Sequence, residues 1–268
     1  MARLTIIIVT FNSAADIGRC LDAIPDAARA TTHEVVVVDN ASTDGTAALV
    51  RSRWPQLRVL DAGGNLGFAR ANNLGIRATT AELVLLLNPD TVPAAGSLDR
   101  LAAILDAMPR VAIAGPRIVD AEGRAELSFG AMIGPFAELR QKLRSRTSIE
   151  RRSRTAAFPD WVSGACLLIR RADLERVGLL DERYFLYTED VDLCAAVRAA
   201  GRLVRFSPEA EVVHARGASR ASATGPAETA YRRSQLAFYQ KHHPGWAPLL
   251  AAYLKLRGRF PDISTQDR

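Results

Sequence analysis

The sequence has few cysteines and no long apolar run. Its three cysteines, Cys20, Cys166 and Cys194, are odd in number and lack CxxC spacing, which argues against a disulfide framework and a cysteine zinc site. The apolar run at residues 4–9 is too short for a signal peptide, and no stretch approaches the roughly 20 apolar residues of a transmembrane helix. We therefore expect a soluble protein of the reducing cytoplasm.

Glycine-rich phosphate-binding loops are also missing from the sequence. It contains neither GxGxxG nor GxxxxGK(S/T), the usual motifs of dinucleotide-binding and P-loop proteins. The net charge is +6, and basic residues gather in residues 138–154, ELRQKLRSRTSIERRSR. No aromatic residue interleaves with these charges, so we expect no nucleic-acid partner. A solvated surface and contact with an anionic partner both remain open for this stretch.

Short apolar runs alternate with amphipathic segments over the first 115 residues. This alternation predicts the α/β class, with a mostly parallel central sheet and helices on both faces. Buried strands are predicted at residues 4–9, 35–38, 57–60, 83–87 and 111–114. Helices are predicted after the cap Ser13, over residues 43–54, from the glycine-rich turn at 62–67 through residue 78, and over residues 98–108.

The regular alternation of strand and helix patterns ends after residue 116, and no linker rich in Gly, Ser or Pro marks the change. Strands are predicted at residues 161–169, 203–206 and 211–213, and helices at residues 172–177, 191–200, 227–243 and 246–256. We therefore expect one continuous domain over residues 1–268, with three segments at 1–115, 116–225 and 226–268.

Polar residues follow three of the predicted strands at the edge where an open parallel sheet binds its ligands. These runs are Thr10-Phe11-Asn12, residues 39–46 and Asn88-Pro89-Asp90-Thr91. Each run alone is also typical of helix capping or a turn, but their convergence indicates a binding site. In the absence of a phosphate loop, a diphosphate can be held through Mg²⁺ or Mn²⁺ on carboxylates. Asp90 is placed for that role.

A second polar cluster lies downstream. Glu189, Asp190 and Asp192 fall in the first turn of a predicted helix, where the helix dipole favours negative charge. Three carboxylates within four positions also repel one another and raise at least one pKa, as a general base requires. His214 follows a predicted strand, and either a structural role or metal ligation fits a histidine there.

Seven segments, in order along the chain, carry a resemblance to a known family. They are IIIVTFN (6–12), VVVVDNASTDGT (35–46), GGNLGFARANNLGI (63–76), LLLNPDT (85–91), WVSGACLLIRR (161–171), YFLYTEDVDLCAAVRAAG (184–201) and VVHARGAS (212–219). Together they resemble the family 2 glycosyltransferases with a GT-A fold, especially the rhamnosyltransferase-like branch. The resemblance implies a Rossmann-like central sheet flanked by helices, with further helices at the C-terminus.

The resemblance also implies roles for individual residues. Asn88-Pro89-Asp90 stands where the family carries its DxD metal motif, with Asn in place of the first acid. Asp90 and His214 would then hold Mg²⁺ or Mn²⁺, and Asp190 would be the catalytic base. Residues implied in donor binding are Thr10, Phe11, Asn12, Asp39, Asp44, Arg70, Asn88 and Asp90. Residues implied in the sugar or acceptor pocket are Trp161, Gly164 and Glu189.

The implied activity is transfer of a sugar from a nucleoside diphosphate sugar, dTDP-rhamnose or a similar donor, with inversion of the anomeric carbon. The acceptor would be a hydroxyl of a cell-surface polysaccharide or lipid-linked glycan. Residues 1–115 would bind the nucleotide sugar, residues 116–225 the acceptor, and residues 226–268 would form a helical segment. Alternatives are UDP-galactofuranose, UDP-glucose or another UDP-sugar as donor, a sugar nucleotidyltransferase, whose GxGTR-type loop is missing here, and a non-catalytic nucleotide-sugar binder.

Two segments also suggest contact with the inner face of the plasma membrane, where lipid-linked acceptors are found. The basic stretch at residues 140–154 and the apolar, cationic segment at residues 246–260 have compositions suited to an anionic membrane surface. The alternative is that the second segment is a helix that packs on the catalytic domain.

Overall fold

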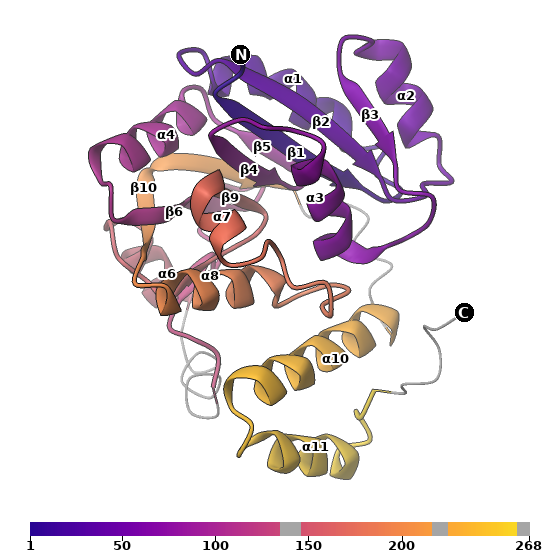
Figure 1. Ribbon diagram of the computed structural model, residues 1–268, viewed down its shortest axis with the longest axis vertical. Helices are drawn as coiled ribbons and strands as arrows, with labels where there is room; N and C mark the ends of the chain where they lie inside the picture. Colours follow the sequence, from indigo (N-terminus) through magenta and orange to yellow (C-terminus); the bar gives the residue numbers. More distant parts are fainter. Residues whose placement is uncertain (135–145, 216–224, 262–268) are drawn as a thin grey trace.

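The computed structural model describes residues 1–134, 146–215 and 225–261 and has a central eight-stranded sheet (Figure 1). The strand order is β3-β2-β1-β4-β9-β6-β10-β5. These strands are β1 (Leu4–Thr10), β2 (His33–Asp39), β3 (Arg58–Asp61), β4 (Leu83–Leu87), β5 (Thr91–Pro93), β6 (Val111–Val119), β9 (Cys166–Arg170) and β10 (Leu203–His214). A small second sheet pairs β7 (Phe129–Gly130) with β8 (Trp161–Val162).

Helices cover both faces of the central sheet because its buried strands are apolar on both sides. The helices are α1 (Ile17–Ala27), α2 (Thr46–Arg53), α3 (Gly67–Arg77), α4 (Ser97–Ala107), α6 (Arg146–Arg152), α7 (Arg171–Arg176), α8 (Glu189–Ala199), α10 (Gly225–His242) and α11 (Ala247–Leu256). In β1, Ile6 and Ile8 join the core cluster with α1, α2 and α4, whereas Ile7 and Val9 join the cluster with α3, α7, α8 and α10. This division follows the two-residue repeat of a strand.

The predicted α/β fold with a mostly parallel sheet is confirmed. Strands β1, β2, β3 and β4 are parallel neighbours, and β6 is parallel to β10. Two strands run the other way: β9 is antiparallel to β4 and β6, and β5 is antiparallel to β10. The antiparallel pairing of β5 with the end of β10 joins two distant segments at one edge of the sheet.

Several local predictions were wrong. The apolar run at residues 161–169 is not one strand, because β8 and β9 belong to different sheets and are separated by a turn. The runs at 203–206 and 211–213 form the single strand β10, with a register shift between Ser207 and Glu211, where Pro208 has no N–H to donate. The side chain of Ser13 does not cap α1, which begins at Ile17.

The C-terminal helices lie apart from the first strands of the chain. Figure 1 shows α10 and α11 together at the end of the molecule farthest from α1 and α2. Helix α10 contacts the loop before α8, where the Ser234 hydroxyl donates a hydrogen bond to the Leu186 carbonyl at 2.7 Å. Over the part of the chain that the structure describes, no helix has the length and apolar character needed to cross a membrane.

Candidate active site

A pocket of about 550 Å³ lies beyond the carboxyl ends of β1 and β4, at the edge where parallel sheets bind their ligands. It brings together segments that are far apart in the sequence. The predicted residues that line it are Phe11, Asn12, Asn88, Asp90, Gly164, Glu189, Asp190 and His214. Some of the predicted donor-binding residues thus lie in one cavity with the residues predicted to hold a metal and with the predicted base.

Asp190 is held by backbone amides on two sides. Its Oδ2 accepts a hydrogen bond from the Gly164 N–H at 2.7 Å, and its Oδ1 accepts one from the Val191 N–H at 2.8 Å. A Cβ atom at position 164 would lie 3.1 Å from the Asp190 Cβ, so the absence of a side chain at Gly164 permits this close approach. Burial raises the pKa of Asp190, although the two N–H groups act in the opposite direction. A raised pKa suits a carboxylate to accept a proton near neutral pH.

The residues just before Asp190 have an unusual conformation. Tyr187 and Thr188 both have positive φ values, 70° and 67°, a region that costs a non-glycine residue free energy and that recurs at functional sites. This turn leads to Glu189, which is buried and whose Oε2 has no hydrogen-bond partner among the described residues. Burial, and then the nearby charge of Asp190, hold the pKa of Glu189 well above its usual value. Glu189 therefore contributes to the pocket wall a buried carboxyl group with a raised pKa.

Asp90 and His214 meet at the junction of β5 and β10. Thr91 pairs with His214 in the strand register, and the Asp90 Oδ1 lies 3.2 Å from the His214 Nε2. The other ring nitrogen, Nδ1, lies 3.5 Å from Glu126 Oε2. Burial lowers the pKa of His214, but its contacts with Asp90 and Glu126 outweigh burial and raise the pKa to about 9. These two contacts fix the orientation of the imidazole, with Nε2 toward Asp90, which lines the pocket.

Asp90 and His214 would hold a divalent cation only with the imidazole deprotonated, because a neutral ring nitrogen is the metal ligand, and such a cation would keep most of its coordination sphere for other ligands. Within residues 1–134, 146–215 and 225–261, no group of three or more His, Cys, Asp or Glu side chains forms a complete metal cage. Mg²⁺ commonly takes only one or two protein ligands and completes its shell with water and substrate phosphates. Adjacent ligands of an octahedral ion with bonds of about 2.1 Å lie about 3 Å apart, close to the 3.2 Å between Asp90 and His214.

Five of the predicted site residues do not line this pocket. The Thr10 hydroxyl donates to Asp39 Oδ1 at 3.1 Å, and Asp39 Oδ2 accepts from the Ser42 N–H at 3.1 Å. The Asp44 carboxylate accepts from the Ala14 and Thr46 N–H groups at 2.9 and 3.0 Å. These three residues hold the loops after β1 and β2 in place.

The other two predicted residues, Arg70 and Trp161, are also absent from the pocket lining. Arg70 on α3 has a half-exposed side chain and pairs with Glu182 at 3.5 Å. The Trp161 indole is buried and donates to the Ala131 carbonyl at 2.8 Å. The polar groups of Arg70 and Trp161 are thus bonded to other parts of the protein.

Several residues in or beside the pocket were not among the individual site residues predicted from the sequence. Asn40 and Asn65 line the pocket, and the Asn40 Nδ2 donates to Asn65 Oδ1 at 2.9 Å. Both belong to segments that carry the family resemblance, which is the signal that could have identified them. Glu126 has no such signal, because only the tertiary fold brings it to His214.

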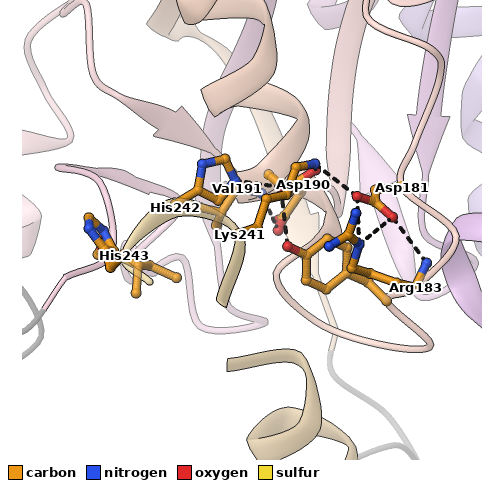
Figure 2. Close-up of polar contacts among 10 residues, drawn as sticks. Asp181, Arg183, Asp190, Val191, Lys241, His242 and His243 are labelled. Atoms are coloured by element: carbon orange, nitrogen blue, oxygen red, sulfur yellow. Dashed lines mark hydrogen bonds and ion pairs between the residues drawn. The ribbon is translucent and has the colours of Figure 1, made fainter. Parts of the chain in front are cut away.

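Asp192 ties the start of α8 to the end of α10. Its carboxylate is 3% exposed and accepts from Lys241 Nζ at 2.8 Å and from the Tyr184 hydroxyl at 3.1 Å. The His242 Nε2 lies 2.6 Å from Asp192 Oδ1. Lys241 also contacts Asp181 at 2.8 Å. Figure 2 shows Lys241, His242 and Asp181 gathered beside Asp190 and Val191 at the start of α8. The helix that carries Asp190 is therefore anchored by α10.

Comparison with known proteins identifies the relatives of this chain. An N-acetylglucosaminyl-diphospho-decaprenol L-rhamnosyltransferase from Mycobacterium tuberculosis is 33% identical over 92% of this chain and 87% of its own length. A rhamnosyltransferase from Escherichia coli is 25% identical over 68% of this chain and 72% of its own length.

Solved structures share the fold. A mannosyltransferase from Pyrobaculum calidifontis, solved with GDP-Man and Mn²⁺, superposes with a TM-score of 0.61 at 23% identity and covers 95% of this chain and 70% of its own. The TarS protein of S. aureus with UDP-GlcNAc has a TM-score of 0.62 at 18% identity and covers 94% of this chain and 71% of its own. The family model described as glycosyl transferase family 2 matches residues 5–178. With this match and a rhamnosyltransferase relative along nearly its whole length, the chain belongs to glycosyl transferase family 2.

Proposed function

We propose that this chain is an inverting rhamnosyltransferase that uses dTDP-rhamnose or a similar nucleoside diphosphate sugar and a lipid-linked glycan acceptor. One observation carries the proposal: Asp190 and the Asp90–His214 pair line the same pocket. This is the pairing that a displacement at an anomeric carbon requires, with a base on one side and charge compensation for the leaving diphosphate on the other. The rhamnosyltransferase relative at 33% identity supports the choice of sugar and acceptor.

In this mechanism, Asp190 accepts the proton of the acceptor hydroxyl as that oxygen attacks the anomeric carbon. The bond to the diphosphate breaks on the opposite face, so the configuration inverts. The backbone N–H groups of Gly164 and Val191 keep the carboxylate in one orientation, which limits the reorganisation needed for proton transfer. Phe11, half exposed at the pocket wall, offers an aromatic face for the nucleotide base.

Asp90 and His214 would hold Mg²⁺ or Mn²⁺ in this proposal, with Asn88 beside them. A divalent cation supplies Lewis-acid stabilisation of the negative charge that builds on a departing diphosphate. Thr10, Asp39 and Asp44 would act by holding the loops after β1 and β2 in place. Arg70 and Trp161 would act from positions that do not line the pocket.

The function is tested by offering one acceptor with several donors. The acceptor is N-acetylglucosaminyl diphosphate on a polyprenyl chain, and the donors are dTDP-rhamnose, UDP-glucose and UDP-galactofuranose with Mn²⁺. We expect a product heavier than the acceptor by one rhamnosyl residue, together with release of dTDP. Transfer only from a UDP-sugar would overturn the choice of donor. Release of pyrophosphate from a sugar phosphate and a nucleoside triphosphate would instead indicate a nucleotidyltransferase.

We also propose that the protein contacts an anionic membrane surface. Helix α11 and its flanks expose an apolar stripe of Trp246, Leu249, Tyr253 and Leu256, which are 44%, 60%, 52% and 87% exposed. The opposite face of α11 packs inward through the fully buried Leu254, so the helix both packs and exposes apolar surface. Of the basic stretch at 140–154, residues 140–145 lie outside the described residues.

Sedimentation with phosphatidylglycerol vesicles tests this contact. We expect the protein to sediment with vesicles at low salt and to be released at high salt, because lysine and arginine near an anionic surface each contribute about 1 kcal/mol and salt screens that attraction. A protein that stays in the supernatant at low salt refutes it.

A further inference from the structure

A second cavity adjoins the candidate active site. It has a volume of about 610 Å³ and lies between α10, α11 and the loop before α8. Phe185 lines both this cavity and the catalytic pocket, so the two spaces meet at one side chain. The volume falls within the range of about 300–1,000 Å³ that is usual for small-molecule sites. We call this cavity the α10–α11 groove.

The lining of the groove is mainly apolar, with cationic side chains as its charged groups. Small and apolar residues make up most of its wall, among them Leu236, Ala237, Ala247, Pro248, Ala251 and Phe260. Arg183 and Arg233 also line it. The Arg183 side chain is 52% exposed, and its guanidinium is paired with Asp181. An apolar groove with arginines at its wall matches a molecule that has an apolar chain and an anionic group.

The two faces of α11 give the groove an orientation. Ala247 and Ala251, one helical turn apart, line the groove, whereas Leu249 and Tyr253 are exposed on the outside of the same helix. A molecule in the groove therefore lies between the catalytic pocket, reached at Phe185, and the helix that exposes the apolar stripe. This is the arrangement needed by a substrate whose reacting sugar is in water and whose tail is in a membrane.

We propose that the α10–α11 groove binds the apolar chain and the anionic diphosphate linker of the acceptor, with the acceptor sugar passing Phe185 into the catalytic pocket. The occupant is thus a polyprenyl diphosphate glycan. This inference rests on the proposed function for the identity of the acceptor. Arg183 and Arg233 contribute positive charge toward the linker, and Ala251 leaves room for the chain.

Direct binding tests the groove independently of catalysis. The probe is a long-chain polyprenyl diphosphate without sugar, in detergent micelles, and the measurement is its dissociation constant for the full chain. Ala251→Trp should weaken binding at least tenfold because the indole fills the groove, and Ala251→Leu should have a smaller effect in the same direction. Ala252→Trp, at an exposed position of α11 that does not line the groove, is the matched control and should bind like the parent.

Charge recognition is measured with the matching polyprenol, which lacks the diphosphate. Arg183→Gln should reduce the preference for the diphosphate over the alcohol about tenfold, whereas Arg257→Gln, on an exposed residue after α11, should leave the preference unchanged. The groove proposal is overturned if the parent does not bind the polyprenyl diphosphate, or if both Ala251 variants bind it as the parent does.

The failure of the proposed function has a different signature. Suppose that the parent binds the polyprenyl diphosphate, that Ala251→Trp does not, and that the parent transfers no sugar from any donor. This result would refute the function and leave the groove supported. Transfer by the parent to long-chain and short-chain acceptors with equal KM, and unchanged KM in Ala251→Trp, would refute the groove and leave the function supported.

Discussion

Lys241→Met removes the cation that joins α10 to the start of α8. In the parent, the Lys241 ammonium lies 2.8 Å from both Asp181 Oδ2 and Asp192 Oδ2. Methionine has a similar length but no charge, so the substitution leaves Asp192 with the Tyr184 hydroxyl and His242 as its remaining side-chain partners. We expect the free energy of unfolding to fall.

The magnitude follows from the exposure of the three groups. Removing one partner of a fully buried ion pair costs about 3–5 kcal/mol, whereas exposed pairs contribute about 0.2–1 kcal/mol. The side chains of Asp192 and Asp181 are 3% and 20% exposed, but that of Lys241 is 30% exposed. Because the exposure of Lys241 lies between these two cases and Asp192 keeps two other partners, we expect the free energy of unfolding to fall by about 2 kcal/mol. At about 2–4 °C per kcal/mol for a chain of this size, Tm falls by about 4–8 °C.

Urea unfolding of parent and variant at several pH values measures the effect and its origin. Burial raises the pKa of Asp181, but hydrogen bonds from Lys241 and Arg183 outweigh burial and hold the pKa below its usual value. The ion pair therefore stabilises the fold above the unfolded pKa of about 3.9, and this contribution is lost as the pH falls through the lower folded value. The difference between parent and variant should thus narrow below about pH 4.

Lys255→Met is the matched control, since Lys255 is exposed on α11. This substitution should lower the free energy of unfolding by less than about 1 kcal/mol. The reasoning fails if Lys241→Met and Lys255→Met unfold at the same urea concentration at pH 7. It also fails if the loss in Lys241→Met is the same at pH 3 and pH 7.

Further predictions concern the site itself. Asp190→Asn should bind the donor nearly as the parent does but lower kcat by about 10²–10⁴, and a variant with kcat near that of the parent would exclude Asp190 as the base. Excess EDTA should abolish transfer and weaken binding of the nucleoside diphosphate, and Asp90→Asn should raise the Mn²⁺ concentration needed for half-maximal activity; activity unchanged in EDTA would disprove the metal role. Gly67→Ala should lower stability by about 3 kcal/mol, because Gly67 has a φ of +79° and a Cβ there would overlap the Phe185 carbonyl. Gly64→Ala, where a Cβ has open space, is its control, and equal Tm values for the two variants would contradict this packing argument.

The sequence alone determined the alternation of strands and helices in the first half of the chain. Apolar runs such as residues 83–87 specify a strand locally because every side chain is buried, and the structure has β4 at Leu83–Leu87. Polar residues follow such strands because the chain leaves the apolar core there and enters a loop. Asn88, Asp90 and His214 could therefore be predicted as candidate site residues because they follow strands, whereas Asp190 was predicted from an acidic cluster at the start of a helix.

Short-range pattern could not show where an apolar run is broken. Residues 161–169 look like one strand, but only pairing with β7 on one side and with β4 and β6 on the other divides them into β8 and β9. The turn between them provides the Gly164 N–H that holds Asp190. Strand β5 was missed because three residues ending in Pro93 have too little pattern to indicate a strand.

Contacts between distant segments were decided by the tertiary structure. Glu126 reaches His214, and Lys241 and His242 reach Asp192, across 49 and 50 residues in the last two cases. Arg70 pairs with Glu182 and does not line the pocket, which its motif did not indicate. A sequence pattern reports which face of its own element a residue occupies, because that depends on local periodicity. Which residue meets it from another element depends on strand order and helix packing, and these arise only when the whole chain buries its apolar surface.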